Sequence, residues 1–159
     1  MSLTRMVLRL AAPLPRVEQF TRYLFIGPHP DDIEIGAGAT AAKLAQMGKQ
    51  VAFVICTDGR FGMTNAPQGM TEEALVETRM REARASAQVL GVSDVRFLSL
   101  PDGAGYETDE LVRSLARVVG DVQPEVLFAP DPFVRGECHE DHLRVGRAAR
   151  QIACFAPYP

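Results

Sequence analysis

Apolar and polar positions form two kinds of pattern along the chain: short apolar runs, and longer segments with apolar residues at helical spacing. Short apolar runs, long enough for buried strands, occupy residues 23–27, 51–57, 95–100 and 126–130. The longer segments between these runs predict helices over about residues 36–48, 71–90 and 108–120, with a last helix beginning near His139. Strand and helix are therefore expected to alternate through the whole chain.

Residues that favour helix ends agree with these boundaries. Gly48 and Gly91 follow the first and second helical segments, where glycine adopts the left-handed conformation of a helix C-terminus without steric cost. Thr71, followed by acidic residues, is expected to cap the second helix, and Thr108 or Asp109 the third. Each helix is thus expected to be a separate element between two strands.

This alternation predicts the fold class. Right-handed crossovers between successive strands build a parallel sheet with helices on both faces. We therefore expect an α/β fold, a Rossmann-like three-layer α/β/α arrangement with a mostly parallel sheet. Ligands of such folds bind outside the carboxyl ends of the strands. The chemistry is expected in the segments that follow the four strands: 27–35, 58–69, 101–107 and 131–141.

Length and composition indicate one globular domain. The 159 residues are 47% hydrophobic and 23% charged, with a formal net charge of -3, so the basic footprint of a nucleic-acid-binding protein is missing. No apolar run reaches the roughly 18 residues that a membrane span needs. Residues 1–21, where Arg5 and Arg9 interrupt an apolar stretch, are interpreted as an N-terminal extension of a domain formed by residues 22–159.

The three cysteines indicate a reducing environment. Cys56, Cys138 and Cys154 form no C-x-x-C pair, and their odd number is unlike a disulfide framework, so the cytoplasm is the expected compartment. Cys56 lies in an apolar run and is expected to be buried. Cys138 adjoins a histidine pair, and we interpret it as a neighbour of that pair in preference to a metal ligand.

All three histidines of the chain fall in segments that follow a predicted strand. His29 and Asp32 are three residues apart, as are His139 and His142, so each pair projects to one side of a helical turn. Imidazole and carboxylate suit zinc, and a catalytic zinc uses three protein ligands and keeps one position open. One of these four residues, together with Asp31, would remain for acid–base chemistry.

A purely structural interpretation of these residues is also available. Asp31 and Asp32 could cap the following helix, and His139 could lie on the surface at a helix start. Each of these explanations is credible alone. Together they require every histidine and a double aspartate to fall by chance on the functional edge of the sheet, so a metal centre is the favoured hypothesis.

Two motifs give a specific family resemblance. The segment His29-Pro30-Asp31-Asp32 directly after the first strand, and the segment His139-Glu140-Asp141-His142 at the head of the last helix, resemble the signatures of the PIG-L/LmbE-like de-N-acetylases. The resemblance covers roughly residues 22–155 and includes Thr57-Asp58-Gly59 after the second strand. It implies zinc as the cofactor.

The resemblance also implies a role for each residue. It makes His29, Asp32 and His142 the zinc ligands. It makes Asp31 the general base, and His139 the group that stabilises the oxyanion or protonates the leaving amine. Asp141 would support the helix start or a neighbouring histidine, as groups behind metal ligands commonly do.

Two further features of the sequence, the Arg79–Glu82 pair and the glycine pattern of residues 36–41, can each be interpreted in two ways. Arg79 and Glu82 resemble the family's R-x-x-E helix and would contact substrate or support the site, but they equally suit a solvated helix face with several charges. Residues 36–41 match G-x-G-x-x-A of dinucleotide-binding proteins. That fingerprint needs its first glycine at the end of the strand, whereas Gly36 lies well beyond Gly27, so close helix–sheet packing is the favoured explanation.

The expected function is removal of the N-acetyl group from an N-acetylglucosamine-type conjugate, a small-molecule amide of an amino sugar. The alternatives are a thiol–sugar conjugate amidase, or a metal-binding protein without turnover. Family members continue well past the second histidine motif, so the C-terminal part of the family fold is expected to be absent from a chain that stops at Pro159. The apolar residues around Phe155 could contact a second subunit, so a homo-oligomer is a further possibility.

Overall fold

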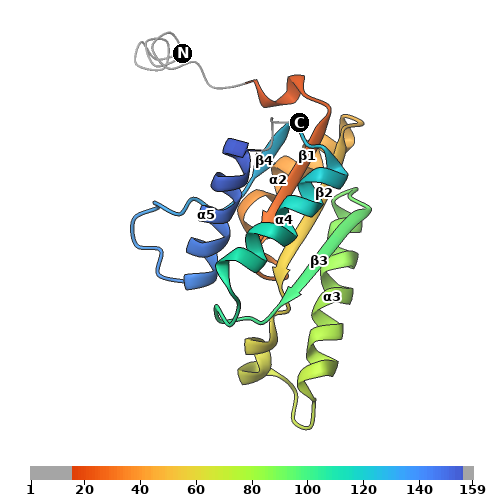
Figure 1. Cartoon of the computed structure of the whole chain (residues 1–159). Coiled ribbons are helices and arrows are strands. Elements are labelled where there is room, and N and C mark those ends of the chain that lie inside the picture. Colours follow the sequence, from red (N-terminus) through yellow and green to blue (C-terminus); the bar gives the residue numbers. More distant parts are fainter. Residues whose placement is uncertain (1–15, 156–159) are drawn as a thin grey trace.

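A computed structural model describes residues 16–155 of the chain (Figure 1). Most of the expected N-terminal extension, residues 1–15, and the last residues, 156–159, lie outside the described part, as does the side chain of Phe155. Within the described residues, no helix is both long and apolar enough to cross a membrane.

Four parallel strands form the sheet in the order β3-β2-β1-β4. Their bounds are Arg22–Gly27 for β1, Gln50–Thr57 for β2, Asp94–Leu100 for β3 and Val126–Phe128 for β4. β1 lies in the middle, with Tyr23 paired to Val51 on one side and to Val126 on the other. The expected strands are confirmed, and the sheet is wholly parallel among the described residues.

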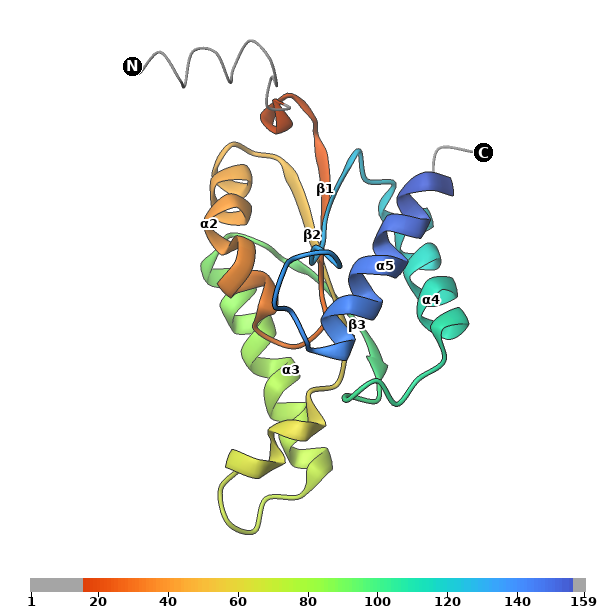
Figure 2. The same cartoon turned by 90° about the vertical axis from the view of Figure 1, so that its left-hand side faces the viewer.

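Helices cover both faces of this sheet, which confirms the three-layer α/β/α fold (Figure 2). On one side lie α2 (Asp32–Gln46) and α3 (Glu72–Val89), and on the other α4 (Thr108–Val122) and α5 (Glu140–Phe155). Short 3-10 helices occupy Val17–Gln19 (η1) and Arg60–Asn65 (η2).

The alternation of side chains in β1 shows how the two layers of core are filled. Tyr23 and Phe25 belong to the apolar cluster under α2 and α3, whereas Leu24 and Ile26 belong to the cluster under α4 and α5. All four are buried, because a central parallel strand has no solvent face. Burial of both faces explains why the strands are continuous apolar runs in the sequence.

Several predicted boundaries are confirmed and others are wrong. The hydroxyl of Thr71 accepts from the backbone N–H of Ala74 as an N-cap, and Gly48 and Gly91 have positive φ beyond their helices. The cap of α4 is Glu107, not residue 108 or 109. The largest error concerns α2, which begins at Asp32 and not near residue 36.

The early start of α2 puts the first histidine motif at the junction of strand and helix. Acidic side chains in the first turn, Asp32 and Glu34, favour the positive end of the helix dipole there. It also places the glycine pattern of residues 36–41 inside the helix. Ala41 is buried, and a Cβ atom on Gly38 would lie 3.6 Å from Leu90, an ordinary packing distance, whereas Gly36 has open space around it.

The strand order creates a crevice between the carboxyl ends of β1 and β4. From β1 the chain winds to β2 and β3, and then returns to the opposite side of β1 as β4. Ligands of doubly wound folds bind at such a reversal point. α5 approaches the crevice closely, because a Cβ atom on its Gly146 would lie 2.5 Å from the carbonyl oxygen of Pro130.

Candidate metal centre

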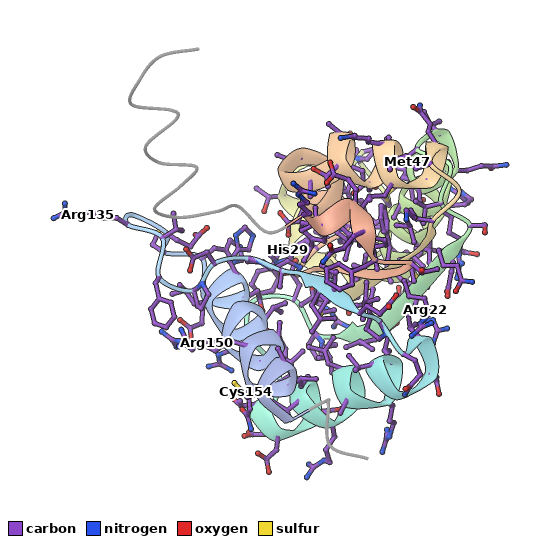
Figure 3. The ribbon with its side chains drawn as sticks, turned by 90° about the horizontal axis from the view of Figure 1, so that it is seen from above. Arg22, His29, Met47, Arg135, Arg150 and Cys154 are labelled. Carbon is purple, nitrogen blue, oxygen red and sulfur yellow. The ribbon has the colours of Figure 1, made fainter. Side chains whose placement is uncertain are left out.

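The segment after β1 brings His29 against Asp32. The Nδ1 atom of His29 lies 3.0 Å from Asp32 Oδ2, and the backbone N–H of His29 donates to the same oxygen at 2.9 Å. Only 14% of the His29 side chain is exposed. Figure 3 shows His29 between the start of α2 and the segment that leads from β4 to α5.

The segment after β4 brings the other two histidines to the same place. The ring centroid of His29 lies 4.6 Å from that of His139 and 5.4 Å from that of His142. The Nε2 atom of His142 lies 3.4 Å from Asp32 Oδ2. The two histidine pairs therefore converge across the β1–β4 crevice, as the spacing of the sequence predicted.

The donor atoms of His29, Asp32 and His142 fit one metal ion. They all lie within 4.8 Å of one another, with Asp32 Oδ2 near one nitrogen of each ring. Two ligands at 2.0–2.1 Å from a tetrahedral zinc stand roughly 3.3 Å apart, close to the distances between these atoms. Two imidazoles and a carboxylate are also the ligand types that leave a catalytic zinc one open position.

A second set of donors, His29, His139 and Asp141, also lies within this distance. Its carboxylate is already engaged, since Asp141 accepts the backbone N–H groups of Gly103 at 3.0 Å and Ala104 at 3.0 Å. Asp141 is fully buried, and it is 3.4 Å from His29 and 3.8 Å from His139. It therefore suits a supporting position better than direct ligation.

Asp31 lies at the entrance of α2 but does not cap the helix with its side chain. Its φ of 142° is rare for a non-glycine residue and marks local backbone strain. The carboxylate pairs with the guanidinium of Arg79 at 2.7 Å, and the same guanidinium donates to the carbonyl of Pro30. These contacts favour a supporting role for Arg79 at the first motif.

Glu82 pairs with the other terminal nitrogen of the Arg79 guanidinium at 3.1 Å, so the two residues of the R-x-x-E pattern contact each other. Two carboxylates of the site were not singled out from the sequence. Asp102 is 7% exposed and lies 3.1 Å from His29 Nε2. Glu137 lies 2.9 Å from His142 Nδ1. The position of Asp102 after β3 was the available signal for it.

This concentration of carboxylates shifts the protonation of the site. Burial alone would lower the pKa of His29, but the hydrogen bond with Asp32 and the charges of Asp32, Asp102 and Asp141 outweigh it and raise the pKa to about 9. Burial opposes ionisation of Asp32, yet its hydrogen bonds with His29 hold its pKa below the ordinary value. The site therefore attracts a cation, whether a proton or a metal ion.

A cleft of about 660 Å³ opens over these residues and reaches all three histidines. It is polar at the motif residues and apolar on the wall formed by Phe61, Pro67, Met70 and Leu75. A mostly apolar cavity of about 370 Å³ adjoins it at Asp32 and His142. Of the two, the larger cleft is the better candidate for substrate, because Asp31, Arg79 and His139 all line it.

The fold and the site define an α/β protein with a cluster of histidines and carboxylates, able to hold a metal ion, at the reversal point of a parallel sheet. The family model PIG-L, GlcNAc-PI de-N-acetylase, matches residues 24–153. The chain belongs to this family.

Relatives with assigned names agree with this membership. The chain is 34% identical to 1D-myo-inositol 2-acetamido-2-deoxy-alpha-D-glucopyranoside deacetylase of Kineococcus radiotolerans, over 91% of this chain and 48% of the relative. It is also 34% identical to diacetylchitobiose deacetylase of Thermococcus kodakarensis, over 87% and 51%. The chain thus spans about half the length of the curated relatives it matches.

A solved structure supports the same fold. N,N'-diacetylchitobiose deacetylase from Pyrococcus horikoshii, in complex with an inhibitor, superposes with a TM-score of 0.82 at 32% identity. The match covers 100% of this chain and 61% of that protein.

Proposed function

We propose that this chain contains the catalytic centre of a zinc-dependent hydrolase that removes the acetyl group from an N-acetylglucosamine-type conjugate. The observation that carries the proposal is the convergence of His29 Nδ1, Asp32 Oδ2 and His142 Nε2, with Asp31 and His139 beside them. The names of the relatives, which are deacetylases of acetylated amino sugars, support the substrate class.

His29, Asp32 and His142 would hold the zinc ion. When bound, the ion would polarise the amide carbonyl and lower the pKa of water toward about 7. Amide hydrolysis also needs a proton acceptor and a proton donor. In this proposal Asp31 is the acceptor and His139 is the donor.

Asp31 accepts the proton of the attacking water in this proposal. Its Oδ2 is held by Arg79, which restrains the carboxylate at the wall of the cleft and leaves Oδ1 to accept the proton. Water adds to the carbonyl carbon, and His139 stabilises the resulting oxyanion or passes a proton to the amine nitrogen. The C–N bond then breaks, and acetate and a free amine are released.

The three cysteines support a reducing compartment, and we propose the cytoplasm. Cys56 is a buried thiol, and Cys138 and Cys154 are exposed thiols, with no disulfide between any of them. The thiol of Cys138 belongs to neither cluster of donor atoms around the histidines.

Acetate release tests the function. Metal-free protein is incubated with N-acetylglucosaminyl-inositol or diacetylchitobiose, with and without added zinc, and acetate and primary amine are quantified. The proposal expects equal amounts of both products, only with zinc. Binding of zinc without either product from any N-acetylglucosamine conjugate would favour metal binding without turnover.

A further inference from the structure

Glu137 connects both histidines of the second motif from the loop that precedes α5. Its Oε2 atom lies 2.9 Å from Nδ1 of His142, and its Oε1 atom accepts the backbone N–H of His139 at 2.8 Å. The side chain is 24% exposed, so water screens these contacts only in part. One carboxylate thus fixes the ring of one histidine and the backbone of the other.

The contact with His142 decides which ring nitrogen is available for a metal ion. A neutral imidazole carries its proton on one nitrogen and a lone pair on the other. A carboxylate at Nδ1 favours the proton there, which leaves the lone pair on Nε2. Nε2 is the atom that faces Asp32 Oδ2 at 3.4 Å, on the side of the proposed ion.

The ring of His29 is likewise placed between Asp32 and a second carboxylate. Its Nδ1 faces Asp32 at 3.0 Å, and its Nε2 faces Asp102 at 3.1 Å. Each of the two histidines therefore directs one nitrogen to the shared oxygen of Asp32 and gives the other to a carboxylate. This pattern is the one by which outer carboxylates orient metal-ligating imidazoles and raise their basicity.

We propose that Glu137 is a positioning residue of the metal centre: it holds His142 in the Nδ1–H tautomer, with Nε2 directed at the ion. The inference rests on the proposed function for the ion itself. Glu140, the first residue of α5, provides a matched control because it is a glutamate close to Glu137 in the chain. Its carboxylate pairs with Arg144 at 3.0 Å and is 51% exposed.

The first experiment reads the tautomer without any metal. In metal-free protein labelled with ¹⁵N-histidine, at a pH where the imidazole of His142 is neutral, long-range ¹H–¹⁵N spectra assign the protonated nitrogen of each of the three rings. The His142 signals are identified by their loss in His142→Ala. We expect the Nδ1–H form for His142 in the wild type and in Glu140→Gln. Glu137→Ala should shift it toward Nε2–H, a change that a merely structural role for Glu137 would not produce.

The second experiment measures metal affinity by competition with a chromophoric chelator, using zinc and cobalt. Glu137→Ala should bind roughly 10- to 100-fold more weakly than wild type, and Glu137→Gln, which keeps an acceptor oxygen, should lie between them. Glu140→Gln should match the wild type. Thermal unfolding of the metal-free variants identifies any that fail to fold.

The outcomes separate this inference from the proposed function. Wild-type affinity in Glu137→Ala with an unchanged tautomer would overturn the inference and leave the metal centre standing. Equal losses in the Glu137 and Glu140 variants would overturn it as well, because they would indicate a general electrostatic effect. A wild type that binds no metal would contradict the proposed function, while the tautomer result would still test the contact between Glu137 and His142.

Discussion

The two ends of the sheet hold charged residues under opposite conditions. At the amino ends of the strands, Arg96 pairs with Asp94 at 3.0 Å and with Asp121 at 3.2 Å, and the three side chains are 30%, 45% and 71% exposed. At the carboxyl ends, Asp102 and Asp141 are 7% and 0% exposed. Both ends contain opposite charges, but only the carboxyl end buries carboxylates this deeply.

We propose that the buried carboxylates at the carboxyl ends of the strands serve the metal site. Exposed ion pairs contribute little, because water and salt screen them. Buried carboxylates are costly unless hydrogen bonds, histidines or a cation compensate them. The carboxyl end concentrates such groups around three histidines, and we interpret that cost as the requirement of a metal site.

The largest effect is expected from Asp31→Asn. The amide cannot accept a proton from water, so turnover should fall by roughly 10²- to 10⁴-fold while zinc content stays near that of the wild type. Acetate release and metal analysis of the same preparation check both parts. Loss of zinc together with activity would contradict the separation of base and ligand.

Arg79→Ala should have the next largest effect. Without its guanidinium, Asp31 loses its partner at 2.7 Å, and turnover should fall by roughly 10- to 100-fold through misplacement of the carboxylate. Arg81→Ala is the control, since Arg81 lies on the same helix and contacts Thr78 instead. Similar kinetics for the two variants would show that Arg79 belongs to a solvated face after all.

Gly146→Ala tests the close approach of α5 to the site. A Cβ atom there would lie 2.5 Å from the Pro130 carbonyl, so we expect a loss of about 1–3 kcal/mol in the free energy of unfolding. Gly120→Ala in α4 meets nothing within 4 Å and should be neutral or slightly stabilising. Chemical denaturation of both variants makes the comparison, and equal stabilities would refute it.

The stability of the metal-free protein should depend on pH through His29. Its folded-state pKa of about 9 exceeds the ordinary 6.5, so protonated His29 stabilises the fold fully below about pH 6.5, and this contribution is lost as pH rises through 9. The melting temperature should therefore fall over that window. His29→Asn should flatten this part of the curve, and an unchanged slope would argue against the raised pKa.

The smallest effect is expected at the amino ends of the strands. Arg96→Ala removes two exposed ion pairs, and the free energy of unfolding should change by no more than about 1 kcal/mol. Zinc content and turnover should not change. A loss of metal in this variant would show that charges at the two ends of the sheet are coupled.

The sequence predicted the fold and the convergence of the histidines well, because both follow from periodicity. Continuous apolar runs such as residues 51–57 identify buried parallel strands, and residues after such strands meet at one edge. The start of α2 was not predictable in this way. The first helix was expected to begin near residue 36, after the His29–Asp32 motif, whereas Asp32 both begins the helix and holds His29 through its side chain.

The supporting carboxylates were harder to recognise for a physical reason. Asp102 lies in a Pro-Asp-Gly turn, where aspartate is common without any function, and only its contact with His29 distinguishes it. Glu137 lies in an irregular loop, and the spacing of apolar residues does not predict the path of such a loop. The two interpretations of Arg79 likewise depended on a contact with Asp31 that bridges 48 positions of sequence.

Zinc binding to wild type and to His142→Ala is the sharpest test of the proposed metal site. Both proteins are stripped of metal, titrated with zinc under chelator competition, and analysed for bound metal per chain. We expect one tightly bound zinc per chain in the wild type and none at the same free zinc concentration in His142→Ala. A wild type that binds no zinc, or a variant that binds it equally well, would contradict the metal centre formed by His29, Asp32 and His142.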